Sequence, residues 1–173
     1  MRTSIAILLS ATVALAGLAA QAQSAETEQD AALPLEPGQA TVLSVVDRWK
    51  ADPLAIFVGA DVDLDDFKWI ARPVIVFANS ENDPAFQDQM RLLLDRPDAL
   101  SDRDVVLITD TDPDGRSGVR LKLRPRGFML ALIGKEGDVQ LRKPLPWSVR
   151  ELVRSIDKSP IRQREMNETP LGN

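Results

Sequence analysis

Two uninterrupted apolar runs constrain the fold of this chain more than any other feature. Residues 73–78 read PVIVFA and residues 104–110 read DVVLITD, and in neither run do apolar and polar side chains alternate. Such runs are typical of strands covered on both faces, which occur mostly in parallel sheets. Because parallel strands need a crossover connection, we expect a helix between the two strands and a right-handed crossover.

The intervening segment carries the signals of that helix. Asp83 is a suitable N-cap, and Pro84 suits the first helical position, where its missing N–H group is not needed. Apolar side chains then recur at helical spacing and predict a stripe that packs on the sheet. These side chains are Phe86, Met90, Leu93 and Leu94.

The C-terminal half predicts an antiparallel hairpin. Residues 128–134 and 139–143 suit strands, and Gly137 lies between them at a turn position. Before the hairpin, residues 115–124 predict a short helix, although apolar and polar residues alternate from 119 to 123 and leave a strand open.

A final helix follows the hairpin. Ser148 and Glu151 have the spacing of a capping box, and Trp147 and Leu152 have the spacing of a hydrophobic staple. We also expect Trp69 and Trp147 to anchor packing, because each borders an apolar element.

This order of elements predicts an α/β fold of the thioredoxin-like (peroxiredoxin-like) kind. It has three layers, α/β/α, with a mixed sheet and a C-terminal β-hairpin plus helix. We expect the domain to span residues 64–158.

Three stretches also carry a resemblance to a known family. They are LDDFKWIARPVIVFA, DVVLITDTD and LRPRGFMLALIGKEGDVQLRKPLPW. They resemble a bacterial family of secreted thioredoxin-like proteins of unknown function, which is similar to a domain in animal extracellular proteins of the sushi-repeat-containing and coiled-coil-domain-containing groups. The resemblance implies a thioredoxin or peroxiredoxin type of fold with no assigned reaction.

Outside this domain the sequence predicts little regular structure. Residues 1–22 have the pattern of a signal peptide, and their apolar run is shorter than the roughly 20 residues of a membrane anchor. We expect a flexible leader over residues 23–40, an extension of uncertain structure with a helix or edge element over residues 41–63, and a disordered tail over residues 159–173. The mature protein is then secreted, most simply to the periplasm, without membrane attachment after cleavage.

The amino-acid inventory excludes thiol chemistry. The chain has no Cys, no His and no Tyr, so disulfide exchange, Cys or His metal sites and imidazole-based triads are impossible. Where thioredoxins carry Cys-x-Pro-Cys, this chain reads NDPA, with Asn82 and Ala85 in place of the two sulfurs. The proline that thioredoxins hold in cis before the hairpin is also missing, and the nearest proline is Pro125.

The charge balance narrows the choice of partners. The chain has 21 positive and 26 negative side chains, a net charge of −5, which does not favour nucleic acid or anionic lipid. We expect the partner to be an unidentified protein or an anionic ligand, and the oligomeric state stays open.

Two groups of residues are candidates for a binding surface. The first is the loop after the first central strand, with Asn79, Ser80, Glu81, Asn82 and Asp83. The second is a basic segment with Arg120, Arg124 and Arg126, in which Arg116 and Lys122 also lie. If this segment folds against the hairpin, it can converge with later cations, which are Arg142, Lys143, Arg150 and Arg154. Guanidinium groups bind carboxylates and phosphates well, but a solvated face neutralised by nearby aspartates is the alternative.

An aspartate-rich turn is a candidate metal site. Asp110, Asp112 and Asp114, followed by Gly115, match the opening of a calcium loop. The twelfth position, however, is Leu121 instead of the required Glu, so a capped strand-to-helix turn is the alternative. Calcium is the one cofactor that the sequence suggests.

Two classes of function remain. We favour a non-catalytic binding or interaction module without redox cysteines. The alternative is a calcium-dependent or carboxylate-based enzyme centred on residues 110–114, because paired carboxylates can act as general acid and base.

Overall fold

The computed structural model describes residues 43–168. The chain divides into two units, Met1–Ala40 and Thr41–Asn173, and the described residues all lie in the second unit. The predictions for residues 1–22 and 23–40 fall outside the described residues. None of the helices within residues 43–168 is long and apolar enough to cross a bilayer.

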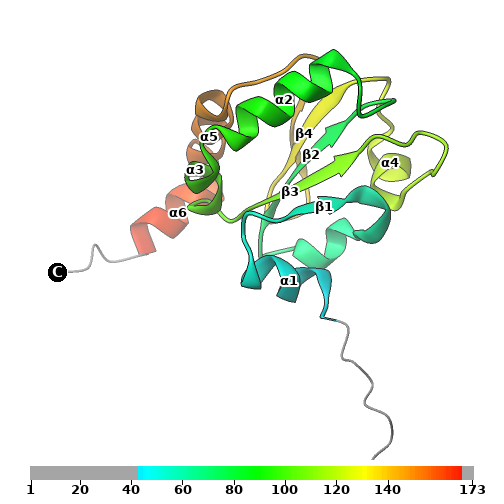
Figure 1. Ribbon diagram of the computed structural model, residues 1–173. Helices are drawn as coiled ribbons and strands as arrows, with labels where there is room; N and C mark the ends of the chain where they lie inside the picture. The colour runs from blue at the N-terminus through cyan, green and yellow to red at the C-terminus, as the bar shows by residue number, and fades with distance from the viewer. Residues whose placement is uncertain (1–42, 169–173) are drawn as a thin grey trace, which may run out of the picture. The chain divides into compact units, whose positions relative to one another are not determined.

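A five-stranded mixed sheet forms the centre of the second unit (Figure 1). β2 (Arg72–Phe77) pairs in parallel with β3 (Val105–Asp110) and antiparallel with β4 (Met129–Ile133). β1 (Ile56–Val58) continues the sheet beyond β3, and β5 (Val139–Lys143) continues it beyond β4. The resulting order β1-β3-β2-β4-β5, with an antiparallel hairpin at one edge, is the thioredoxin-like arrangement and confirms the predicted fold class.

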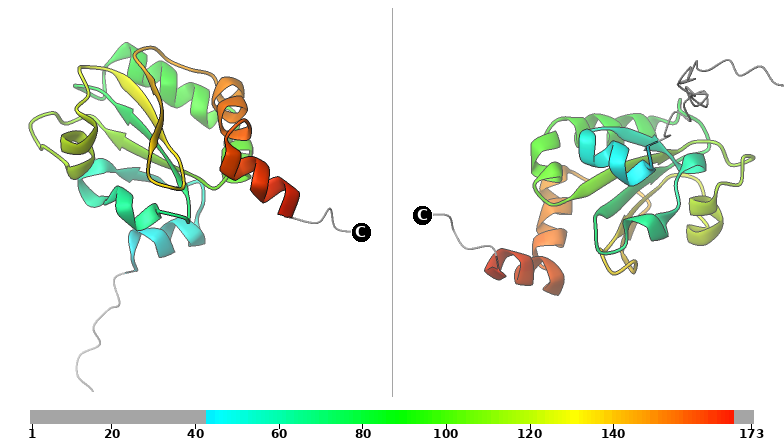
Figure 2. Two further views of the ribbon diagram at one scale, coloured as in Figure 1. Left: turned by 180° about the vertical axis from the view of Figure 1, so that it is seen from behind. Right: turned by 90° about the horizontal axis from the view of Figure 1, so that it is seen from below.

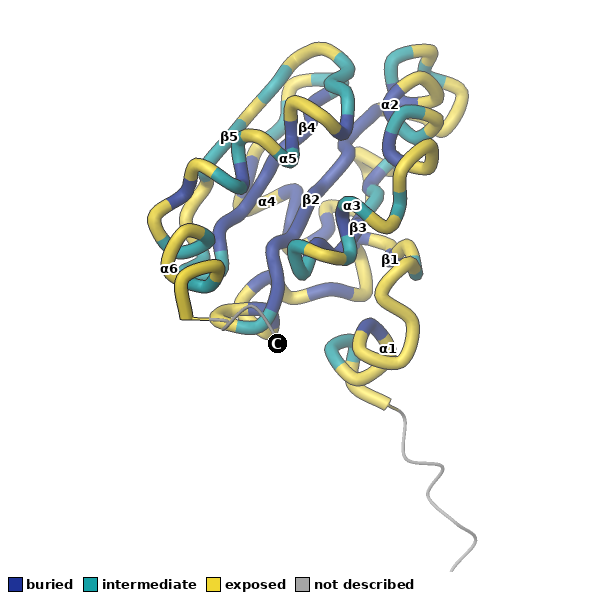
Figure 3. The backbone as a smooth tube through the Cα atoms, turned by 90° about the vertical axis from the view of Figure 1, so that its left-hand side faces the viewer, coloured by how far each residue is buried: buried dark blue, intermediate teal, exposed yellow. Residues whose placement is uncertain are grey.

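Helices cover both faces of the sheet and make three layers (Figures 1 and 2). One face carries α2 (Pro84–Leu94), α3 (Pro97–Ser101) and α5 (Val149–Asp157). The other face carries α1 (Val45–Ala51), α4 (Gly118–Leu123) and two short 3-10 turns, η1 (Gly59–Asp61) and η2 (Leu64–Phe67). All residues of β2 and β4 are therefore buried, as the dark central strands in Figure 3 show.

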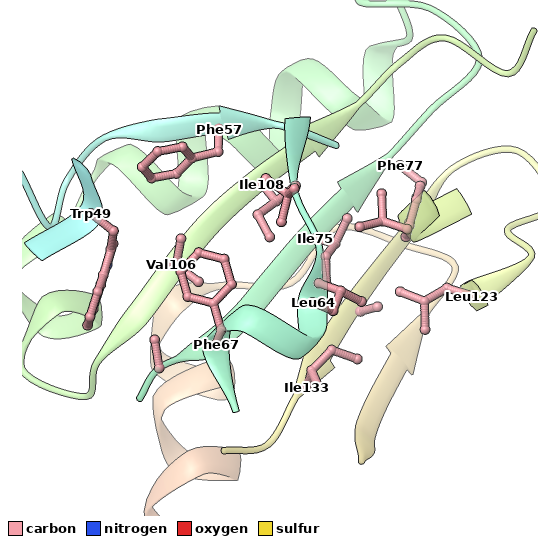
Figure 4. Close-up of a cluster of buried hydrophobic side chains, with 14 of the residues drawn as sticks. Trp49, Phe57, Leu64, Phe67, Ile75, Phe77, Val106, Ile108, Leu123 and Ile133 are labelled. Carbon is pink, nitrogen blue, oxygen red and sulfur yellow. The ribbon is translucent and has the colours of Figure 1, made fainter. Parts of the chain in front are cut away.

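An apolar cluster fills each side of the sheet. In the cluster of Figure 4, Ile75 and Ile108 of the sheet pack with Trp49, Phe67 and Leu123. On the opposite face, the helices contribute Phe86, Leu93, Leu100, Leu152 and Ile156. Each large side chain stabilises the fold by about 1.5–3 kcal/mol when it is fully buried. Apolar side chains cover both faces of the sheet. We therefore expect polar functional groups at the edges of the sheet and in its loops.

The predicted start of α2 is confirmed. The Asp83 carboxylate accepts hydrogen bonds from the N–H groups of Ala85, at 2.8 Å, and Phe86, at 3.3 Å. Phe86 and Leu93 are buried as expected, but Leu94 is 52% exposed, so its place in the packed stripe is wrong. Leu94 is the last residue of the helix, where the chain turns away from the sheet toward α3.

The sheet begins earlier than the predicted domain boundary at residue 64. β1 pairs with β3, and the Trp49 indole of α1 donates a hydrogen bond to the Val105 carbonyl at 3.3 Å. Trp49 also makes an edge-to-face contact with Phe67, with ring centroids 6.5 Å apart. Residues 45–58 therefore belong to the domain.

The predicted disordered tail over residues 159–173 is wrong for most of its length. Ser148 and Glu151 form the predicted capping box at the start of α5, and a further helix, α6 (Pro160–Glu168), follows it. α6 buries no residue and is held by ion pairs, which explains why apolar periodicity does not reveal it.

The two tryptophans that we expect to anchor packing differ. Trp147 is partly buried against the α2–α3–α5 core, whereas Trp69 is 69% exposed and has a left-handed backbone, φ 62°. The Trp69 N–H donates to the Lys135 carbonyl at 2.6 Å, so its backbone is fixed while its indole points away from the core. The prediction is wrong for Trp69.

Candidate anion-binding site

The loop between β2 and α2 is exposed, and several of its hydrogen bonds are formed within the loop or with the start of α2. Asn79, Ser80, Glu81 and Asn82 are exposed, and Asp83 is half-buried at the helix cap. The Ser80 hydroxyl accepts a hydrogen bond from the Asn82 N–H at 3.1 Å, and the Gln87 amide donates to the Glu81 carbonyl. The structure places the five predicted residues together in an exposed turn at the carboxyl end of β2.

Arg120, the first residue of the predicted basic surface, is buried instead. Its guanidinium donates to the Asp110 carboxylate at 2.6 and 2.9 Å and to the Ala78 carbonyl at 2.8 Å. It also lies 5.5 Å from the centre of the Phe77 ring. Arg120 therefore joins α4 to the ends of β2 and β3 and is not available to an external ligand.

The same ion pair removes Asp110 from the candidate calcium site. Asp110 is 4% exposed, and its second carboxylate oxygen accepts a hydrogen bond from the Ser117 hydroxyl. Asp112 accepts a hydrogen bond from the Asp114 N–H at 3.0 Å, as in an ordinary capped turn. Within residues 43–168 no three acidic side chains are arranged to hold a metal ion, so Asp110, Asp112 and Asp114 do not form the predicted calcium site.

The remaining basic residues converge on one pocket, which has a volume of about 310 Å³. Arg124 and Arg126 come from the segment after α4, and Arg142 and Lys143 come from the end of β5. The apolar part of the wall consists of Phe128, Met129 and Pro144. The basic segment and the end of β5 thus line one pocket, whereas Arg150 and Arg154 of the expected convergence line the groove between α3 and α5.

The hairpin register explains why the two basic segments meet. Leu130 pairs with Lys143 and Ala131 with Arg142, so the last residues of β5 lie beside the first residues of β4. The sequence offers Arg142 and Lys143 only as later cations that can converge with the basic segment, and this register explains why they lie beside Arg124 and Arg126.

The four cations of the pocket have no carboxylate partner within residues 43–168. Arg142 donates one hydrogen bond, to the Leu123 carbonyl at 3.0 Å, and Lys143 lies 4.2 Å from the centre of the Trp147 ring. These contacts hold the two side chains in place without neutralising them, which favours the binding of an anion.

Arg124 adopts a backbone conformation that usually selects glycine. It is the residue after α4, with φ 51° and ψ 58°, and its N–H donates to the Arg120 carbonyl at 2.8 Å. A left-handed residue at a helix end is most often Gly, because any Cβ costs about 1 kcal/mol there. Arg124 shares this positive φ with Trp69, Asp104 and Arg116 among the described residues.

Fold and site together define a thioredoxin-like α/β protein without cysteine, in which a capped polar turn connects β2 to α2. Residues 63–165, more than half of the chain, match the family described as Domain of unknown function (DUF4174), and the protein belongs to that family.

The chain is also similar to solved structures of two redox enzymes. The reduced 2-Cys peroxiredoxin of Plasmodium vivax is 16% identical, with a TM-score of 0.49 over 63% of this chain and 90% of that chain. Thioredoxin peroxidase I of Plasmodium yoelii is 19% identical, with a TM-score of 0.45 over 62% of this chain and 81% of that chain. No curated protein matches this sequence.

Proposed function

We propose that this protein is a non-catalytic binding module, which uses the thioredoxin-like scaffold to present a cationic pocket to an anionic ligand or to an acidic segment of a partner protein. The chain has no Cys, His or Tyr. It therefore cannot carry out the reactions that depend on a thiol or an imidazole in other proteins. Binding is the function that its remaining side chains support best.

One observation carries the proposal. Four cations line a single pocket in a chain whose net charge is −5, and no carboxylate within residues 43–168 pairs with them. No acidic residue of the described part of the chain lines this pocket, whereas the cations of the groove between α3 and α5 lie among four aspartates. A concentration of unneutralised charge in a concave site attracts an opposite charge.

The pocket lies at the same end of the sheet as the loop of residues 79–83, where β2 finishes and β4 begins. Met129 pairs with Phe77, the last residue of β2, and Met129 is also part of the pocket wall. A partner that docks at this end of the sheet can therefore contact both the pocket and the loop of residues 79–83. The loop is thus a second contact surface in the proposal.

Export to the periplasm is part of the proposal, and it rests on the pattern of residues 1–22. The resemblance to a domain of animal extracellular proteins agrees with a secreted interaction module. When the full chain is expressed in a Gram-negative host, the protein in the periplasmic fraction should begin at Gln23, as intact mass will show. Retention of residues 1–22 in the cytoplasm would contradict export and would leave the binding proposal unaffected.

Affinity capture tests the binding function. The purified protein is used as bait in a periplasmic extract of its own source, beside R124E/R126E and a control, R96E/R150E. Arg96 and Arg150 are exposed and lie at the α3–α5 groove, so the control changes the net charge equally at another site. We expect R124E/R126E to lose the partners that the wild type and the control retain. An identical set of partners for all three baits, or turnover of a substrate by the purified protein, would refute the proposal.

A further inference from the structure

We propose that the cationic pocket binds a small organic dianion, that is, a compact molecule with two negative charges and an apolar group. This inference rests on the proposed binding function and names the class of ligand. Phosphate monoesters and dicarboxylates share this chemistry, and the experiment below distinguishes them.

The hydrogen-bond donors of the pocket can bind more than one negatively charged group. An arginine offers five N–H donors in a planar fork, and within residues 43–168 Arg142 donates one side-chain hydrogen bond, to the Leu123 carbonyl. This contact holds the guanidinium at the end of β5, so that little side-chain entropy is lost on binding. Arg124 and Arg126 are exposed and form no side-chain hydrogen bond or ion pair within residues 43–168, so they are available to a second anionic group.

The wall of the pocket also has an apolar part. Phe128 is half-buried, Met129 is 9% exposed, and Pro144 lies next to the basic end of β5. Lys143 lies over the Trp147 ring and so bounds the site on the side of α5. A simple inorganic anion would leave the apolar wall of the pocket exposed to water, whereas a ligand with an apolar group would cover it.

The volume sets an upper limit on the ligand. About 310 Å³ is at the low end of the range for small-molecule pockets, which is roughly 300–1,000 Å³. A phosphate or carboxylate pair with a ring of benzene size fits this range.

The larger groove between α3 and α5, about 730 Å³, does not offer the same chemistry. Its cations are mixed with Asp95, Asp98, Asp102 and Asp157, and Arg103 already pairs with Asp157 at 2.8 Å. The groove therefore serves as the control site.

Titration calorimetry of the purified protein at low ionic strength tests the inference with four probes: phenyl phosphate, phthalate, inorganic phosphate and benzoate. We expect saturable one-to-one binding of phenyl phosphate or phthalate, and the tighter of the two identifies the anionic group. Benzoate should bind at least about tenfold more weakly, because it lacks one charge-assisted interaction. Inorganic phosphate should also bind more weakly, because it lacks the apolar group.

Two variants locate the site. R124Q/R126Q should weaken the preferred dianion at least about tenfold, while R96Q/R150Q should leave it unchanged, and both should melt at the wild-type temperature. The inference is overturned if no dianion binds saturably at millimolar concentration, if benzoate binds equally well, or if both variants weaken binding equally. If no dianion binds but partner capture still depends on Arg124 and Arg126, the inference of a small dianionic ligand is refuted. The proposed function as a binding module then still stands.

Discussion

The guanidinium of Arg120 and the carboxylate of Asp110 form a buried ion pair that ties α4 to the carboxyl ends of the central strands. The shorter of their contacts is 2.6 Å, and Arg120 also donates to the Ala78 carbonyl at the end of β2. α4 ends at Leu123, and Arg124 follows it directly, so this pair positions the segment that forms one wall of the pocket.

Removing one partner of this pair should destabilise the protein strongly. R120M leaves the Asp110 carboxylate buried without its cation, which costs about 3–5 kcal/mol of unfolding free energy. The double variant D110L/R120M should recover most of that loss, because no charge is left buried. Urea unfolding of the three proteins measures this, and equal stability of the wild type and R120M would show that the pair is not formed.

A second ionic contact makes the stability of the C-terminal helix depend on pH. Glu165 of α6 accepts two hydrogen bonds from the buried Arg72, both at 2.9 Å. Burial raises the pKa of Glu165, but hydrogen bonds from Lys135, Arg72 and Arg162 outweigh it and hold the pKa below its usual range. A lowered pKa means that the stabilisation is present above the pKa of the unfolded chain and is lost as the pH falls through the folded-state value.

E165Q should therefore be less stable than the wild type at pH 7 by about 2 kcal/mol. The difference should shrink as the pH falls below the ordinary glutamate pKa of about 4.3. E168Q is the matched control, because Glu168 is exposed on the same helix, and it should follow the wild type at every pH. Thermal unfolding between pH 3 and pH 7 measures the three proteins, and a pH-independent difference between E165Q and the wild type would contradict the account.

Calcium should have no effect on the melting temperature. Asp110 is committed to Arg120, so Asp112 and Asp114 are left without the further oxygen ligands that calcium requires. Differential scanning fluorimetry with millimolar calcium, and with magnesium as the control, measures the shift. A rise of several degrees that calcium alone produces would restore the metal site.

The turn between β2 and α2 should accept a redox pair if its NDPA sequence is equivalent to the Cys-x-Pro-Cys of thioredoxins. Asn82→Cys together with Ala85→Cys gives a Cys-x-Pro-Cys sequence at the start of α2. The first thiol should have a pKa below the ordinary value of about 8.5, because the N-terminus of a helix stabilises a thiolate. Alkylation at different pH values followed by mass spectrometry measures this pKa, and a pair that neither oxidises nor shows a lowered pKa would argue against the equivalence.

The elements that sequence reasoning predicted are those with local signals. The runs that became β2 and β3, the Asp83 cap and the Ser148–Glu151 capping box all depend on residues close together in the chain. β1 escaped clear assignment because it has only three residues, of which Phe57 alone is buried. α6 was missed because it buries nothing and depends on Arg72, which lies 93 residues away from Glu165.

The candidate site was predicted in part for the same reason. The cluster of cations is visible in sequence, but the burial of Arg120 depends on Asp110 and Ala78 in other elements. The sequence suggests that the basic segment meets later cations, and only the three-dimensional structure shows that Arg142 and Lys143 share its pocket while Arg150 and Arg154 do not.

Amide chemical shifts of the isotope-labelled protein during titration with phenyl phosphate test the central claim most directly. If the cationic pocket is the binding site, the shifts should be saturable and concentrated in residues 124–129 and 142–144. Shifts confined to residues 79–83 or 110–114, or weak shifts spread over all exposed cations, would contradict it.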